Sequence, residues 1–215
     1  MLSIRLKAVA DLVDDNKIVA DIGCDHALLS IYLVEKGISN KVYAIDNKKG
    51  PLSKAKENIE LANLNDKIET ILGDGLTNLP EDTGIVIMAG IGGLLAINML
   101  EKASRIPDCL IIQANNHLKE LRSYLSKNGY LIENEKILLD SGIYYEILKI
   151  KKGNQNLSDE DLIFGPLLRK EKNDIFIDKW SKHLEHLEYI INKNKNSSKL
   201  IDLMKMVELI RNEIN

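Results

Sequence analysis

The segment from Lys17 to Leu28 constrains the fold more than any other part of the chain. A short apolar run, Ile18 to Ala20, ends at Asp21-Ile22-Gly23 and is followed at once by a helical pattern from Ala27 to Glu35. A strand, a tight turn and a helix N-terminus in this order are typical of α/β proteins that hold a nucleotide-like ligand at the turn. We therefore expect an α/β fold with a ligand site at this turn.

Two carboxylates indicate which ligand the turn accepts. Asp46 follows a second apolar run, Lys41 to Ile45, and a carboxylate there can accept hydrogen bonds from ribose hydroxyls. Asp25 stands where glycine is common in such turns, and its charge would repel a pyrophosphate but tolerate a cation. The two residues together favour S-adenosylmethionine, a cationic sulfonium compound, over NAD as the cofactor.

Composition narrows the class of protein. The chain has 215 residues, enough for one domain and a smaller appendage. Its two cysteines, Cys24 and Cys109, make neither a disulfide framework nor a zinc quartet, and the histidines lack metal-ligand spacing. With no bilayer-spanning stretch and no signal-peptide core, we expect a soluble cytoplasmic protein without a metal or a membrane partner. The net charge of −3 means that any RNA contact must come from local basic patches.

Strand and helix patterns alternate through the first two thirds of the chain. Apolar runs at 18–20, 41–45, 68–72, 85–88 and 109–113 alternate with helical patterns, which predicts a parallel sheet with helices on both faces. Two further runs, from 130 to 139 and from 144 to 150, flank a Ser141-Gly142 turn and predict a hairpin that ends the sheet with an antiparallel strand. This layout is typical of the Rossmann-like domain of class I methyltransferases.

The pattern changes after residue 152. A polar linker at 153–156 leads to two heptad-like apolar stripes, at 177–191 and 200–214, joined by a polar loop. Such stripes predict an antiparallel helical coiled-coil hairpin with its apolar seams facing. We therefore divide the chain into a Rossmann-like domain, 1–152, and a helical domain, 153–215. Whether the hairpin grips RNA or only caps the core stays open, as does the oligomeric state, with a monomer favoured.

Four motifs carry a resemblance to a known family. They are Asp21-Ile22-Gly23-Cys24-Asp25-His26-Ala27-Leu28-Leu29, Gly73-Asp74-Gly75, Ala89-Gly90-Ile91-Gly92-Gly93 and Gln113-Ala114-Asn115. Together they resemble the motifs of the bacterial TrmK-type tRNA adenine N1-methyltransferases, and the resemblance covers nearly the whole chain. It implies S-adenosylmethionine as cofactor, tRNA as partner and methylation at N1 of adenine 22. Ala114 stands where proline is usual in the family, which loosens the backbone beside Asn115.

The motifs supply the expected site residues. Asp25 and Asn115 are the expected catalytic residues, because a nearby carboxylate suits the positive charge that moves onto the adenine ring. Asp25 has a second possible role as cap of the helix that starts near Ala27. Cofactor contacts are expected from Arg5, Asp21, Gly23, Asp25, His26, Asp46, Asn47, Gly73, Asp74, Gly75, Ala89, Gly90 and Gly92. Substrate contacts are expected from Gly93, Gln113, Asn115, Lys193, Lys195 and Lys199.

Other functions are compatible with parts of the pattern. A small-molecule or protein methyltransferase would use the same fold, and a non-catalytic RNA-binding module would keep a vestigial pocket. A nicotinamide oxidoreductase is disfavoured by the missing Gly-x-Gly-x-x-Gly motif and by the Asp25 charge. The segment 89–92 also lacks the Asn/Asp-Pro-Pro-aromatic motif common in enzymes that methylate exocyclic amines. A ring nitrogen is the acceptor that remains.

The three lysines at the tip of the helical hairpin provide a test of its role. Replacing Lys193, Lys195 and Lys199 together by alanine should weaken tRNA binding while sparing cofactor binding, because phosphate contacts lie there if the hairpin grips RNA. Binding to tRNA and to S-adenosylmethionine, measured separately, checks this. Unchanged tRNA affinity in the triple variant would remove the tip from the binding surface.

Overall fold

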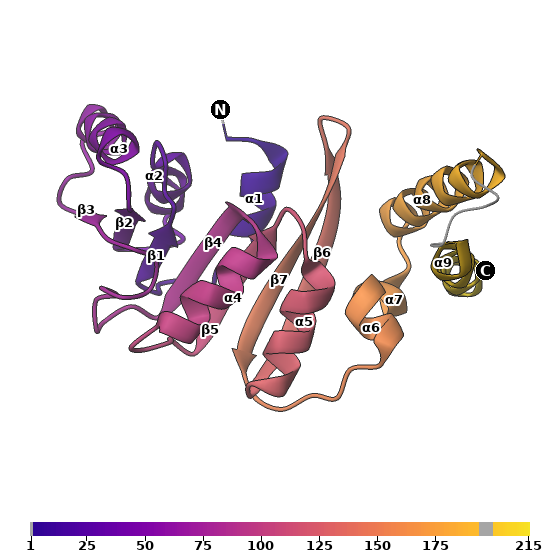
Figure 1. Ribbon diagram of the computed structural model, residues 1–215. Helices are drawn as coiled ribbons and strands as arrows, with labels where there is room; N and C mark the ends of the chain where they lie inside the picture. The colour runs from indigo at the N-terminus through magenta and orange to yellow at the C-terminus, as the bar shows by residue number, and fades with distance from the viewer. Residues whose placement is uncertain (1, 194–199) are drawn as a thin grey trace.

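Seven strands form one sheet, and the computed structural model describes residues 2–193 and 200–215 (Figure 1). The strand order is β3-β2-β1-β4-β5-β7-β6, and the first five strands pair in parallel. The strands are β1 (Val19–Ile22), β2 (Val42–Asp46), β3 (Ile68–Leu72), β4 (Ile85–Ile91), β5 (Cys109–Ala114), β6 (Tyr130–Asp140) and β7 (Ile143–Lys152). The predicted Rossmann-like sheet with a terminal hairpin is confirmed.

Helices cover both faces of the sheet, as the alternating pattern predicts. Helices α1 (Ile4–Ala10), α2 (Leu28–Glu35) and α3 (Lys49–Leu61) pack with one set of buried strand residues, and α4 (Gly93–Lys102) and α5 (Leu118–Lys127) pack with the other. Four helices follow the sheet: α6 (Asp159–Phe164), α7 (Leu168–Glu171), α8 (Asp174–Lys193) and α9 (Leu200–Ile214). Because successive strand residues point to opposite faces, each strand contributes to both cores.

Two features of the sheet differ from the prediction. Strand β4 continues past Met88 to Ile91 through an irregularity at Gly90, whose φ of 80° requires glycine. Strand β7 inserts between β5 and β6, so the antiparallel strand is not the edge of the sheet. The extension of β4 matters most, because it carries the glycine segment out to the end of β5.

The last two helices pack through the apolar residues that the heptad pattern selects. Trp180 and Leu187 of α8 and Val207 and Ile210 of α9 are buried in one cluster. Glu188 of α8 also pairs with Arg211 of α9, so the two helices lie against each other, and their coiled-coil geometry stays a prediction. The division of the chain after residue 152 and the monomeric state stay predictions. Within 2–193 and 200–215, no helix is long and apolar enough to cross a membrane.

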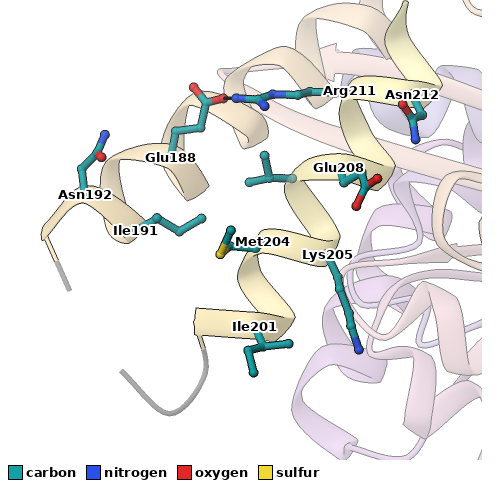
Figure 2. A pocket seen from close by; sticks show the side chains of 10 residues that line it. Glu188, Ile191, Asn192, Ile201, Met204, Lys205, Glu208, Arg211 and Asn212 are labelled. Carbon is teal, nitrogen blue, oxygen red and sulfur yellow. Dashed lines mark hydrogen bonds and ion pairs between the residues drawn. The ribbon is translucent and has the colours of Figure 1, made fainter. Parts of the chain in front are cut away.

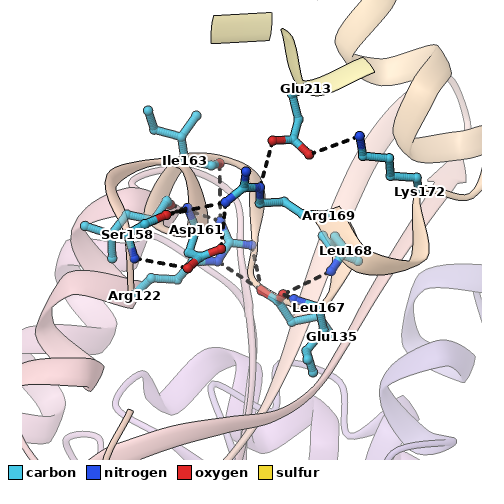
Figure 3. A network of polar contacts seen from close by, with 11 residues as sticks. Arg122, Glu135, Ser158, Asp161, Ile163, Leu167, Leu168, Arg169, Lys172 and Glu213 are labelled. Carbon is cyan, nitrogen blue, oxygen red and sulfur yellow. Dashed lines mark hydrogen bonds and ion pairs between the residues drawn. The ribbon is translucent and has the colours of Figure 1, made fainter. Parts of the chain in front are cut away.

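A buried ion-pair network attaches the C-terminal helices to the sheet (Figure 3). Arg122 of α5 is fully buried and pairs with Glu135 of β6 at 2.8 Å and with Glu146 of β7 at 2.5 Å. Glu146 also binds Lys179 of α8, and Glu135 accepts the backbone N–H of Leu167 at 2.9 Å. Burial alone would raise the pKa of Glu146, but the charges of Arg122 and Lys179 outweigh it and hold that pKa below its ordinary value.

A second ion pair in the same region ties the end of the chain to the short helices. Arg169 of α7 binds Asp161 at 2.8 Å and Glu213 at 2.7 Å, and Glu213 is also buried (Figure 3). Ser158 and Asp161 form a capping box at the start of α6, because each side chain accepts the other residue's backbone N–H. The C-terminal helices are therefore held by charge as well as by apolar packing.

Removing the central cation should destabilise the protein strongly. We expect Arg122→Ala to lower the free energy of unfolding by about 3–5 kcal/mol, because two buried carboxylates lose their main counter-charge. Arg211→Ala is the matched control, since Arg211 and Glu188 form an exposed pair at 2.5 Å whose loss costs about 1 kcal/mol or less. Urea unfolding of both variants at pH 7 measures the difference. Equal losses would contradict the central role of Arg122.

Candidate functional site

The loop that follows β1 and the last residues of β4 meet over one cavity at the carboxyl edge of the sheet. The cavity has a volume of about 280 Å³, and helix α1 covers part of it with Arg5 and Leu6. The other lining residues are Asp21, Gly23, Cys24, Asp25, His26, Leu28, Leu29, Ala89 and Gly90. Two of the four sequence motifs, which lie more than 50 residues apart in the chain, therefore form one site.

The turn after β1 has a strained backbone. Gly23, Asp25 and Ala27 all have positive φ values, of 73°, 48° and 56°. Residues other than glycine adopt this conformation at an energetic cost, and such strain is common at ligand sites. Asn58 of α3 holds the turn by donating to the carbonyl oxygen of His26 at 2.9 Å. In this left-handed turn, the side chain of Asp25 is exposed at the cavity.

Asp25 does not cap the following helix, so this second expected role is wrong. Helix α2 begins at Leu28, its N-cap is Ala27, and no side chain hydrogen-bonds to its first turn. The backbone is left-handed at both Asp25 and Ala27. The imidazole of His26 lies beside the Asp25 carboxylate, with its Nε2 3.7 Å from Asp25 Oδ1. Asp25 therefore remains available to a ligand.

Asp46 ties the neighbouring loops together. One oxygen of its carboxylate accepts the backbone N–H of Asp25 at 3.3 Å, and the other accepts that of Lys48 at 2.9 Å. Its backbone carbonyl accepts the N–H of Gly73 at 3.1 Å, which brings the turn after β3 alongside. A carboxylate has about four acceptor positions, so Asp46 keeps capacity for ligand hydroxyls.

Asp21 is a buried acid in the cavity wall. Burial raises its pKa to about 6, a hydrogen bond from Ser30 opposes the rise, and the Asp46 charge adds to it. The Ser30 hydroxyl donates to Asp21 Oδ2 at 2.7 Å. Burial and the neighbouring carboxylates also raise the pKa of the Cys24 thiol, which keeps it protonated and unsuited to act as a nucleophile. The cavity thus concentrates negative charge, which favours a cationic ligand.

Gln113, at the end of β5, connects both sides of the site. Its side chain is fully buried, and its Oε1 accepts from Arg5 Nη1 and from the Gly90 backbone N–H at 2.9 Å. Its Nε2 donates to Asn115 Oδ1 at 3.0 Å. The expectation that Gln113 offers its own amide to a purine is therefore wrong, because protein groups already engage that amide. Gln113 instead positions Arg5, Gly90 and Asn115.

The exposed amide of Asn115 is oriented by this network. Its Nδ2 donates to the Gly90 carbonyl oxygen at 2.9 Å, while its Oδ1 accepts from Gln113. A carbonyl only accepts and a guanidinium only donates, so both amides have one possible orientation. In the described part of the chain, one Asn115 N–H and one Oδ1 lone pair remain without a partner. They lie at the end of β5, beside the glycine segment.

The remaining glycines of that segment serve packing. A Cβ on Gly93 would lie 2.6 Å from the His117 carbonyl oxygen and 2.7 Å from that of Asn116, so only glycine fits. Gly93 is buried, and its predicted contact with substrate is replaced by this close approach of α4 to the 116–117 backbone. Gly92 lies next to the same segment.

The structure brings together most, but not all, of the predicted site. Arg5, Asp21, Gly23, Asp25, His26, Ala89 and Gly90 line the cavity, while Asp46, Asn47, Gly73, Asp74, Gly75 and Gly92 lie on adjoining loops outside its wall. Sequence reasoning missed Leu6, Leu28, Leu29 and Tyr145, whose ring lies 5.3 Å from the Arg5 guanidinium. An apolar residue near the start of a helix has no chemical feature that marks it in the sequence as part of a ligand site.

Of the three predicted lysines, the structure describes only Lys193, which does not line this cavity. Lys193 is the exposed last residue of α8, whereas Lys195 and Lys199 fall outside the described residues. A larger hollow, of about 910 Å³, lies between α8 and α9 (Figure 2). Ile191, Ile201 and Met204 form its apolar part, and the Glu188–Arg211 pair closes one side. Within 2–193 and 200–215 no group of three His, Cys, Asp or Glu side chains could hold a metal ion.

The raised pKa of Asp21 predicts a pH-dependent gain in stability for Asp21→Asn. In the folded parent, the Asp21 carboxyl group is neutral at low pH. The parent loses stability as the pH rises from about 4 through about 6, because this buried group then ionises. Asparagine stays neutral, so the variant should match the parent near pH 4 and exceed it at pH 7 by about 3 kcal/mol. Urea unfolding at both pH values measures this. The exposed Asp66→Asn should show no such trend, and equal curves for the Asp21 variant and the parent would contradict the assignment.

Comparison with known proteins agrees with this architecture. A family model described as TrmK, tRNA (adenine(22)-N(1))-methyltransferase, matches residues 19–213. The Bacillus subtilis tRNA (adenine(22)-N(1))-methyltransferase is 32% identical over 231 aligned residues, which cover 100% of this chain and 97% of that protein. A Streptococcus pneumoniae protein crystallised with S-adenosyl-L-methionine is 35% identical and matches over 100% of both chains with a TM-score of 0.92.

A further crystal structure agrees over almost the same length. TrmK of M. capricolum, in complex with S-adenosyl-homocysteine, is 31% identical, covers 100% of this chain and 98% of that one, and has a TM-score of 0.90. The match of the family model and of the B. subtilis relative spans the sheet, the cavity and the C-terminal helices alike. This chain therefore belongs to the TrmK family of tRNA (adenine(22)-N(1))-methyltransferases.

Proposed function

We propose that this protein transfers the methyl group of S-adenosylmethionine to N1 of adenine 22 in tRNA, in the cytoplasm. The observation that carries the proposal is the juxtaposition of an acidic cavity with the oriented Asn115 amide at the carboxyl edge of the sheet. The acidic cavity suits a cationic cofactor, and the amide suits the edge of a base. Cys24 and Cys109 are buried free thiols, which fits a reducing compartment.

The cavity residues fit the proposed cofactor. Asp21 and Asp25 supply negative charge for its sulfonium and ammonium groups, and Arg5 supplies a cation for its carboxylate. Asp46 has acceptor capacity for the ribose hydroxyls, and Asp74, exposed on the turn after β3, can accept from the adenine amino group. Gly23 and Gly90 add no side chain to this edge. A Cβ on Gly90 would lie 3.2 Å from Arg5 Nη1, so glycine at this position lets the Arg5 guanidinium come close. When bound, the cofactor supplies an electrophilic methyl group.

Asn115 can select the acceptor atom. The Watson–Crick edge of adenine presents the exocyclic amino group, a donor, beside N1, an acceptor with a lone pair. The open lone pair of Asn115 Oδ1 can accept one N–H of that amino group, which leaves the N1 lone pair free to attack the methyl carbon. No base is required, because no proton leaves N1 when the new bond forms. Orientation of the two reacting atoms is then the main contribution of the protein.

Negative charge near the ring assists the same step. The methyl transfer moves a positive charge from sulfur to the adenine ring, and the exposed Asp25 carboxylate at the cavity can stabilise that charge. In a paired adenine, N1 is occupied by a hydrogen bond to the partner base. The target adenine therefore has to be unpaired or flipped out before its N1 can reach the carboxyl edge of the sheet.

Primer extension on tRNA tests the proposal directly. Incubation with this protein and S-adenosylmethionine should create a reverse-transcription stop at position 22, because methylated N1 cannot pair. A tRNA transcript with guanine at position 22 should give no stop. If adenine-22 tRNA remains unmodified under conditions where the cofactor binds, the proposed function is wrong.

The same assay tests Asn115. We expect Asn115→Ala to lower kcat about 100-fold, because one oriented contact to the reacting base is lost, while the affinity for S-adenosylmethionine stays within twofold. Asn128→Ala is the matched control, since Asn128 caps α5 at the opposite edge of the sheet and should leave kcat unchanged. A kcat for Asn115→Ala close to that of the parent would exclude the proposed contact.

A further inference from the structure

A second hollow lies where the start of β7 meets α8. Its volume is about 350 Å³, and its walls are Tyr144, Lys179, Trp180, Lys182, His183 and His186. Every ionisable side chain in these walls other than the tyrosine is a base. None of these residues takes part in the cofactor cavity. With a net charge of −3 over the whole chain, a local cluster of this kind is what a polyanion would need.

We propose that this basic hollow binds a phosphodiester group of the tRNA backbone, next to the nucleotide that enters the active site. The inference rests on the proposed function, since tRNA is the partner. It places an RNA contact in the middle of α8, apart from Lys193 at the end of that helix.

The position of β7 supports this placement. Gln113 pairs with Ile147, so Tyr144 lies three residues beyond the end of the paired part of β5, at the same edge as the cofactor cavity. Neighbouring strands are about 4.8 Å apart, and three such steps separate β7 from β1, so these two strands lie about 14 Å apart across the sheet. The hollow and the cofactor cavity therefore belong to the same edge of one sheet.

Adjacent residues of β7 face the two sites. Side chains alternate along a strand, so Tyr144 and Tyr145 lie on opposite faces of the sheet. Tyr145 lies under the Arg5 guanidinium at the cofactor cavity, while the Tyr144 hydroxyl accepts from Lys182 Nζ at 2.9 Å. The start of β7 is therefore a shared wall, and an RNA strand that crosses the hairpin reaches both sites.

One lysine in the walls of the hollow can exchange its carboxylate partner for a phosphate. Lys182 binds Asp178 at 2.9 Å, with the two side chains 59% and 44% exposed, and such exposed pairs are worth little. Its Nζ can turn to a phosphate oxygen at small cost. Lys179, by contrast, stays bound to the buried Glu146 and lies over the Trp180 ring at 4.5 Å. It holds the floor of the hollow in place.

The two histidines add donors on the same helix. His183 stacks edge-on against Trp180 at 5.7 Å, and burial, followed by the charges of Lys179 and His186, lowers its pKa. Burial is the largest cause of that shift, and the neighbouring bases add to it. An imidazole N–H can donate to a phosphate oxygen in either charge state of the ring. The walls thus offer an ammonium group and two ring N–H donors to one anion.

Charge-removing variants of the full-length protein test the site. For Lys182→Gln/His186→Gln we expect the Kd and KM for tRNA to rise threefold to tenfold, with kcat and the affinity for S-adenosylmethionine unchanged. The slope of log Kd against log salt should fall in magnitude by about one, as expected for one lost phosphate contact. Lys152→Gln is the matched control, because Lys152 lies at the other end of β7 and is also paired with an exposed aspartate.

The outcomes separate the two proposals. If the parent methylates adenine 22 but the double variant binds tRNA with an unchanged Kd and salt slope, the hollow is not an RNA site and the proposed function stands. A weaker Kd with an unchanged slope, or an equal loss in Lys152→Gln, also overturns the phosphate contact. A parent that binds tRNA through the hollow without methylating it would contradict the proposed function alone.

Discussion

The antiparallel insertion of β7 between β5 and β6 is the constraint on which the rest of the structure depends. Its pairing with β5 places the start of the strand at the carboxyl edge of the sheet, among the loops that form the cavity. Three consecutive residues then reach three environments: Tyr144 faces Lys182, Tyr145 lies under Arg5, and Glu146 binds Arg122. A shift of register by one residue would exchange these faces and separate all three contacts.

The Arg122 network shows how charge can specify an assembly. Two buried carboxylates from the β6–β7 hairpin need cations, and Arg122 of α5 and Lys179 of α8 supply them. Buried ion pairs add little net stability compared with apolar packing, but the loss of one partner is costly. The network therefore accepts one arrangement of the C-terminal helices, the one that brings α8 against the start of β7.

The candidate active site depends on a different balance. Asp21, Asp25 and Asp46 carry like charges close together, and Asp21 is destabilised by burial. Backbone N–H groups and the Ser30 hydroxyl stabilise part of this charge. A cationic ligand would relieve the remainder, so the protein gives up some stability in the free state for affinity toward such a ligand. The strained backbone at Asp25 and Ala27 likewise costs stability in the free protein.

The sequence by itself determined the order of strands and helices, the strand–turn–helix at residues 17–28 and the acidic character of the turn, because periodicity, glycines and charges are local properties. It placed Asp21 and Asp25 correctly at the cavity. Only the tertiary structure decided that Gln113 is buried and serves as a link, that Asp25 leaves α2 uncapped, and that β7 inserts between β5 and β6. These outcomes depend on which distant groups compete for the same hydrogen bond or apolar face, and that competition arises only when the strands are paired.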